Sequence, residues 1–324
     1  MDTLLVLRHL RVENVNAVAG LTWGFPAISN FLGFVHALSR KLSPEFGVAL
    51  EGCGVVCHEH HMLAHRPRGY GDYVFALTRN PLTKGGDTSS FVEEGRMHMT
   101  VSLLIPCAGL LDTRRDPSEV VEAITMLIYQ QRLAGGTVVD IGKVEWLEVP
   151  EEDEFLSKFE RIQLKKMLPG FALVNRSDLL TDHVKRCREE NGDIEEFDAW
   201  LDFAALKFQA VLPEDQDKEK ADSQTPAEWQ YVPKPGKGWL VPLTIGYRGI
   251  SELFAPGKVA RARDTGTPFR FVESVYGVGE WVSPHRLENI EQMVWRYSAE
   301  PESGWYLCRN DYQPKNQLIQ EKEG

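Results

Sequence analysis

The stretch from Cys53 to His61 carries the side chains best suited to bind a metal ion. It reads Cys-Gly-Val-Val-Cys-His-Glu-His-His, and thiolate and imidazole groups are common zinc ligands. The spacing matches no common zinc module. Alternation along a strand also predicts that Cys53 and Cys57 face away from His58 and His60. We therefore expect neither a metal site nor a cofactor here, and we expect both cysteines on the buried face of a strand.

Histidines elsewhere in the chain do not form a recognisable catalytic pattern. General acid–base cleavage of RNA needs a histidine near a second histidine, a tyrosine or a lysine at one phosphate. His36, His98 and His285 are scattered along the sequence. The Gly236-Lys237-Gly238 segment lacks the upstream glycine and the magnesium-binding hydroxyl of a phosphate-binding loop. The sequence therefore predicts no catalytic residue.

Arginines and aromatic residues are interleaved in three parts of the chain. Guanidinium groups hold phosphates while aromatic faces stack on unpaired bases, so this mixture is typical of RNA contact. Each residue also has an ordinary alternative, since aromatic rings fill cores and exposed arginines are usually solvated. The candidate RNA-binding residues are Trp23, Gly24, Phe25, Arg79, Asn80, Arg96, Arg132, Gly135, Gly136, Arg248, Arg261, Arg263, Arg270, His285 and Arg286.

Strands and helices alternate in the first half of the chain. Apolar residues at helical spacing predict one helix over 26–42, and Asp116-Pro117-Ser118-Glu119 opens a second helix that ends at Gly135-Gly136. The resulting β-α-β-β-α-β order is the ferredoxin-like arrangement used by RNA-recognition modules. We thus predict an α+β fold with a ferredoxin-like domain over 1–150. Its strands are expected at 3–12, 52–62, 97–105 and 137–147.

The connection between the two middle strands is far longer than a hairpin needs. Residues 63–96 carry several basic side chains and place Gly85-Gly86 at the expected tip. Long insertions of this kind are usually functional or disordered. We interpret this segment as a projecting β-hairpin, which we call the thumb.

The second half of the chain divides into three parts. Residues 151–212 are predicted to be helical, interrupted by a strand near Phe171–Val174, and 213–237 to form an acidic mobile loop. Residues 238–324 are rich in glycine, aromatic residues and arginine, and we expect them to pack back on the core.

The charge is unevenly distributed. The formal net charge is −11, and residues 151–228 contain 20 acidic against 11 basic side chains. Overall acidity argues against tight binding to bulk DNA through phosphates alone. Basic patches remain possible on either side of the acidic middle segment.

The cysteine count and the hydropathy indicate the cellular compartment in which the protein is expected. Five scattered cysteines in a chain this long suit a reducing cytoplasm better than a disulfide framework. No run approaches 18 apolar residues, so we expect no membrane span. The first residues lack the basic start of a signal peptide and are interpreted as a strand.

Several stretches, in order, resemble one family, the Cas-five-type subunit of the type I-F CRISPR complex, which is the second of the Csy proteins. They run from about residue 20 to residue 300, nearly the whole chain. The stretches are Leu21–Pro26, Gly33–Leu38, Val55–His58, Leu77–Leu82, Val92–Arg96, Arg132–Gly136, Leu168–Val174, Gly238–Pro242, Phe271–Glu273 and Gly279–Arg286.

The resemblance implies a ferredoxin-like body with a thumb and binding of the 5′ handle of the CRISPR RNA. It also implies pairing with the large subunit as a heterodimer, contact with an adjacent backbone subunit, and engagement of target double-stranded DNA through the complex. A separate endonuclease processes the precursor RNA in this subtype, so the subunit is expected to be non-catalytic. Residues 58–72 and the acidic loop are the least family-like parts.

The handle is expected to lie in a groove between the Trp23–Phe25 turn, the Arg132–Gly136 loop and the C-terminal arginines. Backbone amides at Gly24, Gly135 and Gly136 would approach phosphates. Glu93 and Glu94 either orient the thumb arginines or form solvated pairs. Two alternatives stay open: a metal-independent endoribonuclease that processes CRISPR repeat RNA, and a protein-interaction scaffold.

Overall fold

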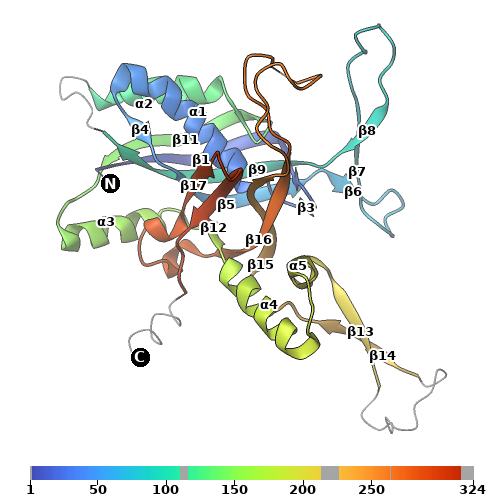
Figure 1. Ribbon diagram of the computed structural model, residues 1–324. Helices are drawn as coiled ribbons and strands as arrows, with labels where there is room; N and C mark the ends of the chain where they lie inside the picture. The colour runs from blue at the N-terminus through green and yellow to red at the C-terminus, as the bar shows by residue number, and fades with distance from the viewer. Residues whose placement is uncertain (1, 110–115, 213–225, 263, 315–324) are drawn as a thin grey trace.

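The computed structural model describes residues 2–109, 116–212, 226–262 and 264–314. Within these ranges the protein is a mixed α/β structure in which five α-helices surround a large antiparallel sheet (Figure 1). The helices are α1 Ile28–Phe46, α2 Pro117–Tyr129, α3 Asp153–Lys165, α4 Ser177–Asn191 and α5 Glu196–Ala204, with 3-10 turns η1 Pro284–Arg286 and η2 Glu291–Met293.

The main sheet has 11 strands, and most of them follow the order β10-β11-β1-β9-β5-β12-β16-β15-β18-β17, with β4 paired to β9. These strands are β1 Thr3–Asn16, β4 Ala49–Leu50, β5 Cys53–Met62, β9 Arg96–Ala108, β10 Arg132–Leu133, β11 Gly136–Glu148, β12 Phe171–Asn175, β15 Leu240–Gly249, β16 Val272–Val282, β17 Val294–Glu300 and β18 Trp305–Asn310.

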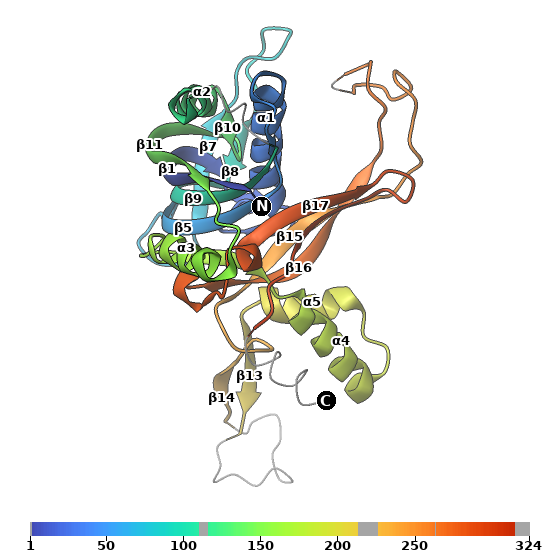
Figure 2. The same ribbon diagram turned by 90° about the vertical axis from the view of Figure 1, so that its left-hand side faces the viewer.

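The central strands are buried on both faces, which explains their continuous apolar runs. In β1, Leu5 and Leu7 pack into the core beneath α1 and α2, whereas Leu4 and Val6 pack into a second core beside α3. Figure 2 shows α1 and α2 on one side of the sheet and α3 on the other. Two-sided burial fixes the strand register, because a one-residue slip would exchange the residues of the two cores.

The elements predicted in the first half are all present, but several differ in length, and the helix expected over 26–42 is Ile28–Phe46. The strands expected at 3–12 and 97–105 extend to Asn16 and Ala108. The side chain of Asp116 accepts the Ser118 backbone N–H at 2.9 Å, so this residue caps α2 as its sequence suggests.

The predicted end of the second helix is wrong. Helix α2 stops at Tyr129, and the chain then forms a β10–β11 hairpin in which Leu133 pairs with Gly136. Ala134 and Gly135 occupy its turn with φ of 49° and 78°. Two consecutive left-handed residues are the requirement of a two-residue hairpin turn, so the glycine pair marks a hairpin instead of a helix end.

Strand β5 joins the two halves of the molecule. One edge pairs with β9, while the other edge pairs with β17 at Cys53 and Gly54 and with β12 at Val56 and Cys57. Pairings among β12, β16, β15, β18 and β17 then return to β5, so these six strands form a closed circuit. The C-terminal region therefore packs back on the first half through this strand.

Two smaller sheets stand apart from the main one. The thumb consists of β6 Ala64–His65, β7 Val74–Arg79 and β8 Phe91–Glu94, with β7 and β8 antiparallel. The other is a hairpin of β13 Lys207–Val211 and β14 Glu228–Val232. The loop expected over 213–237 thus contains a strand, because alternating aromatic residues in β14 pair with β13, and its acidic part at 213–225 lies outside the described residues.

A short hairpin follows β1, with β2 at Val18–Ala19 and β3 at Thr22–Trp23. It brings the Trp23–Phe25 turn back toward the junction of β5 with the C-terminal strands. In the described part of the chain, no helix is both long and apolar enough to span a membrane.

Candidate functional site

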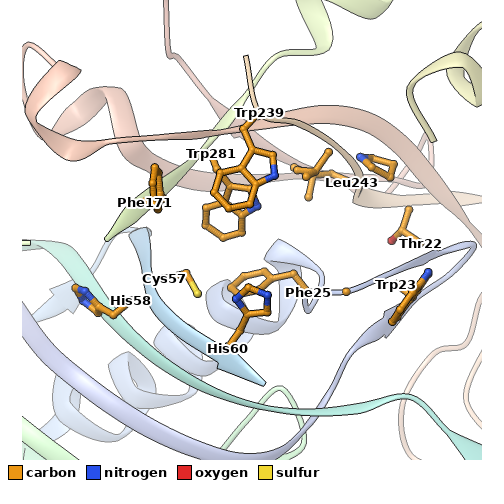
Figure 3. A pocket seen from close by; sticks show the side chains of 13 residues that line it. Thr22, Trp23, Phe25, Cys57, His58, His60, Phe171, Trp239, Leu243 and Trp281 are labelled. Carbon is orange, nitrogen blue, oxygen red and sulfur yellow. The ribbon is translucent and has the colours of Figure 1, made fainter. Parts of the chain in front are cut away.

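An aromatic cavity of about 350 Å³ lies where the Trp23–Phe25 turn faces the junction of β5, β12 and β16 (Figure 3). Volumes of roughly 300–1,000 Å³ and mainly apolar walls are typical of small-ligand sites. The cavity is lined by Thr22, Trp23, Gly24, Phe25, Cys57, His58, His60, Phe171, Trp239, Val241, Pro242, Leu243 and Trp281.

The aromatic walls are arranged in packed pairs with exposed faces. Phe25 meets Trp281 edge-on at 4.9 Å between ring centroids, and Phe171 meets Trp239 in the same way at 5.2 Å. Trp23 and Trp239 are 55% and 53% exposed, respectively, so both present ring surface to solvent. Stacking on such faces requires little rearrangement of the protein.

Hydrogen bonds hold the turn that carries Trp23 against the C-terminal strands. Thr22 and Thr244 both donate their hydroxyls to the Ala19 carbonyl, at 2.8 and 2.7 Å. The Leu21 backbone N–H donates to the Tyr276 hydroxyl at 3.1 Å. The opening of the cavity is therefore fixed by contacts between residues more than 200 positions apart in the chain.

His58 forms part of the cavity wall, and both of its ring nitrogens have partners. Nδ1 lies 2.6 Å from the Pro169 carbonyl and Nε2 lies 2.7 Å from the Ser102 hydroxyl. That hydroxyl oxygen also accepts the His9 backbone N–H. A neutral imidazole with its proton on Nδ1 satisfies every partner, because Ser102 then donates to Nε2. Burial lowers the pKa of His58, which favours the same neutral form.

The expected placement of His60 opposite Cys57 is wrong. A bulge between Cys57 and Glu59 inserts His58 as an extra residue, so that His60 pairs with Met99 and Cys57 with Val101. Met99 and Val101 both belong to one core cluster, so Cys57 and His60 share a face and line the same cavity. Burial raises the pKa of the Cys57 thiol to about 12, which keeps it protonated.

The histidines considered for RNA cleavage have separate surroundings. His36 contacts the Tyr297 hydroxyl, and His98 accepts the Asn14 backbone N–H. His285 hydrogen-bonds Ser283 within η1. The three are therefore separate from one another and none of them lines the aromatic cavity, while His98 stacks on His61 at 6.3 Å between ring centroids.

Arg96 and the Arg132–Gly136 hairpin lie close to the turn that carries Trp23. Arg96 donates to the Asn14 carbonyl at 3.3 Å, while the next part of β1 bonds the hairpin through Asn16 N–H and the Ala134 carbonyl at 2.9 Å. The Ala17 carbonyl accepts the Gly24 N–H at 2.9 Å. The end of β1 thus connects three of the predicted binding segments.

Two of the predicted RNA-binding residues, Arg79 and Asn80, lie on the thumb and away from the end of β1. Arg79 ends β7 and stacks on the Phe91 ring with 4.8 Å from its guanidinium carbon to the ring centroid, and Asn80 follows it. At the thumb base, Phe75 meets Trp23 edge-on at 5.6 Å. Glu94 pairs with Arg96 at 3.0 Å, and this hydrogen bond lowers the pKa of Glu94. One of the two expected glutamate–arginine contacts is therefore present.

The C-terminal arginines do not line the aromatic cavity. Arg248 stacks on Trp305 at 5.2 Å, and Arg270 donates to the Pro301 carbonyl at 2.8 Å, so both support the β17–β18 hairpin. Arg261 is exposed on the projecting segment between β15 and β16 (Figure 1). Arg263 lies outside the described residues. His285 and Arg286 are exposed in η1, which packs beside α3.

The three predicted glycines have different local roles. The N–H of Gly24 is bonded to Ala17, and the Gly135 carbonyl accepts from Arg132 at 3.2 Å. A Cβ atom at Gly136 would lie 2.6 Å from the Glu13 carbonyl oxygen. Close backbone packing therefore explains Gly136 without a ligand.

The sequence as a whole matches the family model described as CRISPR-associated protein (Cas_Csy2), over residues 5–308. The chain belongs to this Csy2 family. It is also 39% identical, over 313 residues and 94% of each chain, to the CRISPR-associated protein Csy2 of Pseudomonas aeruginosa (strain UCBPP-PA14).

Five of the stretches that resemble the Csy2 family meet at the aromatic cavity. They contribute the Trp23–Phe25 turn, Cys57 with His58, Phe171, Trp239 with Val241 and Pro242, and Trp281. Sequence reasoning missed Phe171, Trp239 and Trp281 as members of one site. The sequence did contain a signal for this shared site, because four of these five stretches carry an aromatic residue.

Proposed function

We propose that this Csy2-family chain is a non-catalytic subunit of the type I-F CRISPR RNA-guided surveillance complex, the Csy complex, in antiviral defence. In this role it binds the 5′ handle of the CRISPR RNA and pairs with the large subunit, next to a backbone subunit. Target double-stranded DNA is engaged through the assembled complex. This corresponds to the Cas-five-type position in such assemblies.

The observation that carries the proposal is the preformed aromatic cavity beside Arg96 and Arg132. Single-stranded RNA is bound by stacking of unpaired bases on aromatic rings, with arginines on the flanking phosphates. The cavity offers ring surface from Trp23 and Trp239, and the exposed Arg132 lies on the hairpin bonded to the same end of β1. We place one unstacked handle base in the cavity and the adjoining phosphates toward these arginines.

We also assign a ferredoxin-like core to the first half of the chain. The supporting observation is the strand order β11-β1-β9-β5, in which every neighbouring pair is antiparallel. Helices α1 and α2 cover one face of these strands, as the β-α-β-β-α-β order requires. The thumb then corresponds to the connection between the two middle strands.

The non-catalytic assignment is supported by the separation of His36, His98 and His285 from one another. His58 is the best buried candidate, but both of its nitrogens are engaged and its pKa is lowered by burial. Purified protein incubated with repeat RNA is expected to leave the RNA intact. Specific cleavage that disappears in a His→Ala variant would instead favour the endoribonuclease.

The binding assignment is tested by assembling the complex with Trp23→Ala, Trp239→Ala or the control Trp229→Ala. Trp229 is 73% exposed on β14, away from the cavity. Loss of one base–aromatic stack is expected to cost about 1–3 kcal/mol, on the order of tenfold to a hundredfold in Kd for the guide RNA. Equal retention of guide RNA by Trp239→Ala and by the control would contradict the handle-binding role of the cavity.

A further inference from the structure

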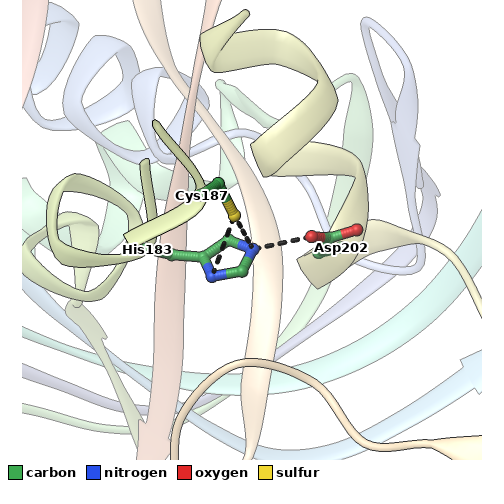
Figure 4. A group of neighbouring side chains, drawn as sticks. All are labelled: His183, Cys187 and Asp202. Carbon is green, nitrogen blue, oxygen red and sulfur yellow. Dashed lines mark hydrogen bonds and ion pairs between the residues drawn. The ribbon is translucent and has the colours of Figure 1, made fainter. Parts of the chain in front are cut away.

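Helices α4 and α5 bring together three side chains of the kinds that bind transition metals (Figure 4). His183 and Cys187 lie four residues apart on one face of α4, and Asp202 lies opposite them on α5. Their donor atoms all lie within 4.8 Å of one another, and this is the one such three-residue group among the described residues.

The donor atoms are close enough to meet one ion after side-chain rotation. Bonds of about 2.0–2.3 Å in a tetrahedral zinc site place neighbouring donor atoms roughly 3.3–3.6 Å apart. The Cys187 sulfur lies 3.5 Å from His183 Nε2 and 3.7 Å from Nδ1, so it is beside the imidazole ring and not along the Nε2 lone pair. Nε2 lies 2.6 Å from Asp202 Oδ2, a hydrogen-bond distance that a bound ion would lengthen. Binding of one ion therefore requires the His183 ring and the Cys187 side chain to rotate toward a common point.

The charged side chains around the group leave Asp202 Oδ2, the carboxylate oxygen that faces His183, without a lysine or arginine partner among the described residues. Lys207 pairs with Asp202 Oδ1 and so holds the carboxylate with Oδ2 directed at His183. The other nearby ion pairs, Lys185 with Asp182 and Arg188 with Glu196, are on exposed surface. A thiolate and a carboxylate facing one lysine have a net negative charge, which favours a divalent cation.

Helix α4 packs against α5, β15 and β16 through Leu179 and Leu180, which are only partly buried. Among the α4 side chains that the structure describes, only Val184 and Cys187 are buried. Its contacts with α5 include the cluster, the exposed pair between Arg188 and Glu196, and the packing of His183 edge-on against Phe203 at 5.6 Å between ring centroids. An ion bound by both helices would therefore act as a cross-link beside this apolar contact.

We infer that His183, Cys187 and Asp202 bind one divalent transition-metal ion, with Zn²⁺ the best match, and that water completes the coordination. Mixed sulfur, nitrogen and oxygen ligands suit zinc and exclude magnesium or calcium. On binding, the Cys187 thiol releases its proton to solvent. The Nε2 proton that faces Asp202 is also released, and Nδ1 takes up one proton, so the imidazole stays neutral.

The test uses the full-length chain, freed of metal with a chelator and titrated with Co²⁺ as the probe. Wild type is expected to bind one equivalent with a thiolate-to-cobalt charge-transfer band, and Zn²⁺ is expected to abolish the band by displacement. Cys187→Ser should lack the band. Asp198→Asn, an exposed acid on the same helix α5, should titrate like wild type.

Two further variants keep the inference testable if Cys187→Ser does not fold. His183→Asn and Asp202→Asn should each weaken Co²⁺ binding by more than about tenfold, the smallest loss expected even for an outer partner of a metal ligand. Zn²⁺ should also raise the Tm of wild type more than that of either variant. The absence of a thiolate band in wild type, or its persistence in Cys187→Ser, would overturn the inference.

Discussion

The aromatic cavity and the arginine-bearing segments differ in how firmly the protein holds them. The cavity is built from segments of the hairpin after β1, β5, β12, β15 and β16, which share a sheet junction and several buried hydrogen bonds. Arg79 and Arg261 instead lie exposed on projecting segments. The cavity is thus preformed, whereas the outlying arginines can converge only around a ligand or partner, at a cost in ordering.

The largest expected effect concerns Gly136, in the hairpin that carries Arg132. In Gly136→Ala the added Cβ would crowd the Glu13 carbonyl and the Val15 side chain, at 2.6 and 2.8 Å. We expect a loss of about 1–3 kcal/mol in the free energy of unfolding, measured with urea. Gly33→Ala is the control, since nothing lies within 4 Å of its Cβ and helix α1 should gain stability. Unchanged stability with lost RNA binding would instead give Gly136 a role at a phosphate.

The salt dependence of guide-RNA binding separates stacking from phosphate contact. Each arginine that neutralises a phosphate of single-stranded RNA contributes about 0.7 to the slope of log K against log salt concentration. Arg79→Ala should therefore reduce the slope by about this amount, whereas Trp239→Ala should lower affinity at an unchanged slope. A reduced slope in Trp239→Ala would mean that the cavity acts mainly by holding a phosphate.

The pH dependence of stability tests the rigidity of the cavity wall. The pKa of His58 is lowered from 6.5 by burial, so the unfolded chain takes up a proton before the folded protein does. The free energy of unfolding should then fall as pH drops below about 6.5, with at most about 1.4 kcal/mol per pH unit from this residue. His58→Gln should flatten that fall, and the exposed His65→Gln should not. Equal slopes in the two variants would show that His58 is not the responsible group.

The smallest effect is expected for the pair between Glu94 and Arg96. Both side chains are about 30% exposed, and partly exposed pairs contribute about 0–1 kcal/mol. Glu94→Gln should therefore leave the free energy of unfolding nearly unchanged while loosening Arg96 and weakening guide-RNA binding slightly. Tighter RNA binding in this variant would indicate that Glu94 competes with the phosphates for Arg96.

Most of the first-half fold was predictable because its signals are local. The Asp116 cap and the helical spacing of α1 and α2 depend on neighbours within a few residues, and both predictions are confirmed. The glycine pair after α2 was ambiguous, because glycine serves helix ends and hairpin turns equally well. The bulge at His58 depends on pairing with β9, so single-strand alternation could not reveal it.

The site was less predictable, since its members come from distant parts of the chain. The Trp23–Phe25 turn was found from its composition, but Phe171 and Trp281 join it only through pairings of β12 with β5 and β16. The arginines were selected by type alone, and type does not distinguish Arg248, which stacks on Trp305, from a residue that meets RNA. Their roles in binding stay predictions.

The closed circuit of strands through β5 also governs when during synthesis the cavity can exist. Trp23 emerges from the ribosome early, but its opposite wall includes Trp281, and β5 is completed by β17, which begins at Val294. A nascent or prematurely terminated chain thus has the turn without the pocket. Trp23 therefore lacks its opposite wall until the chain has been translated through β16, and the circuit closes only with β17.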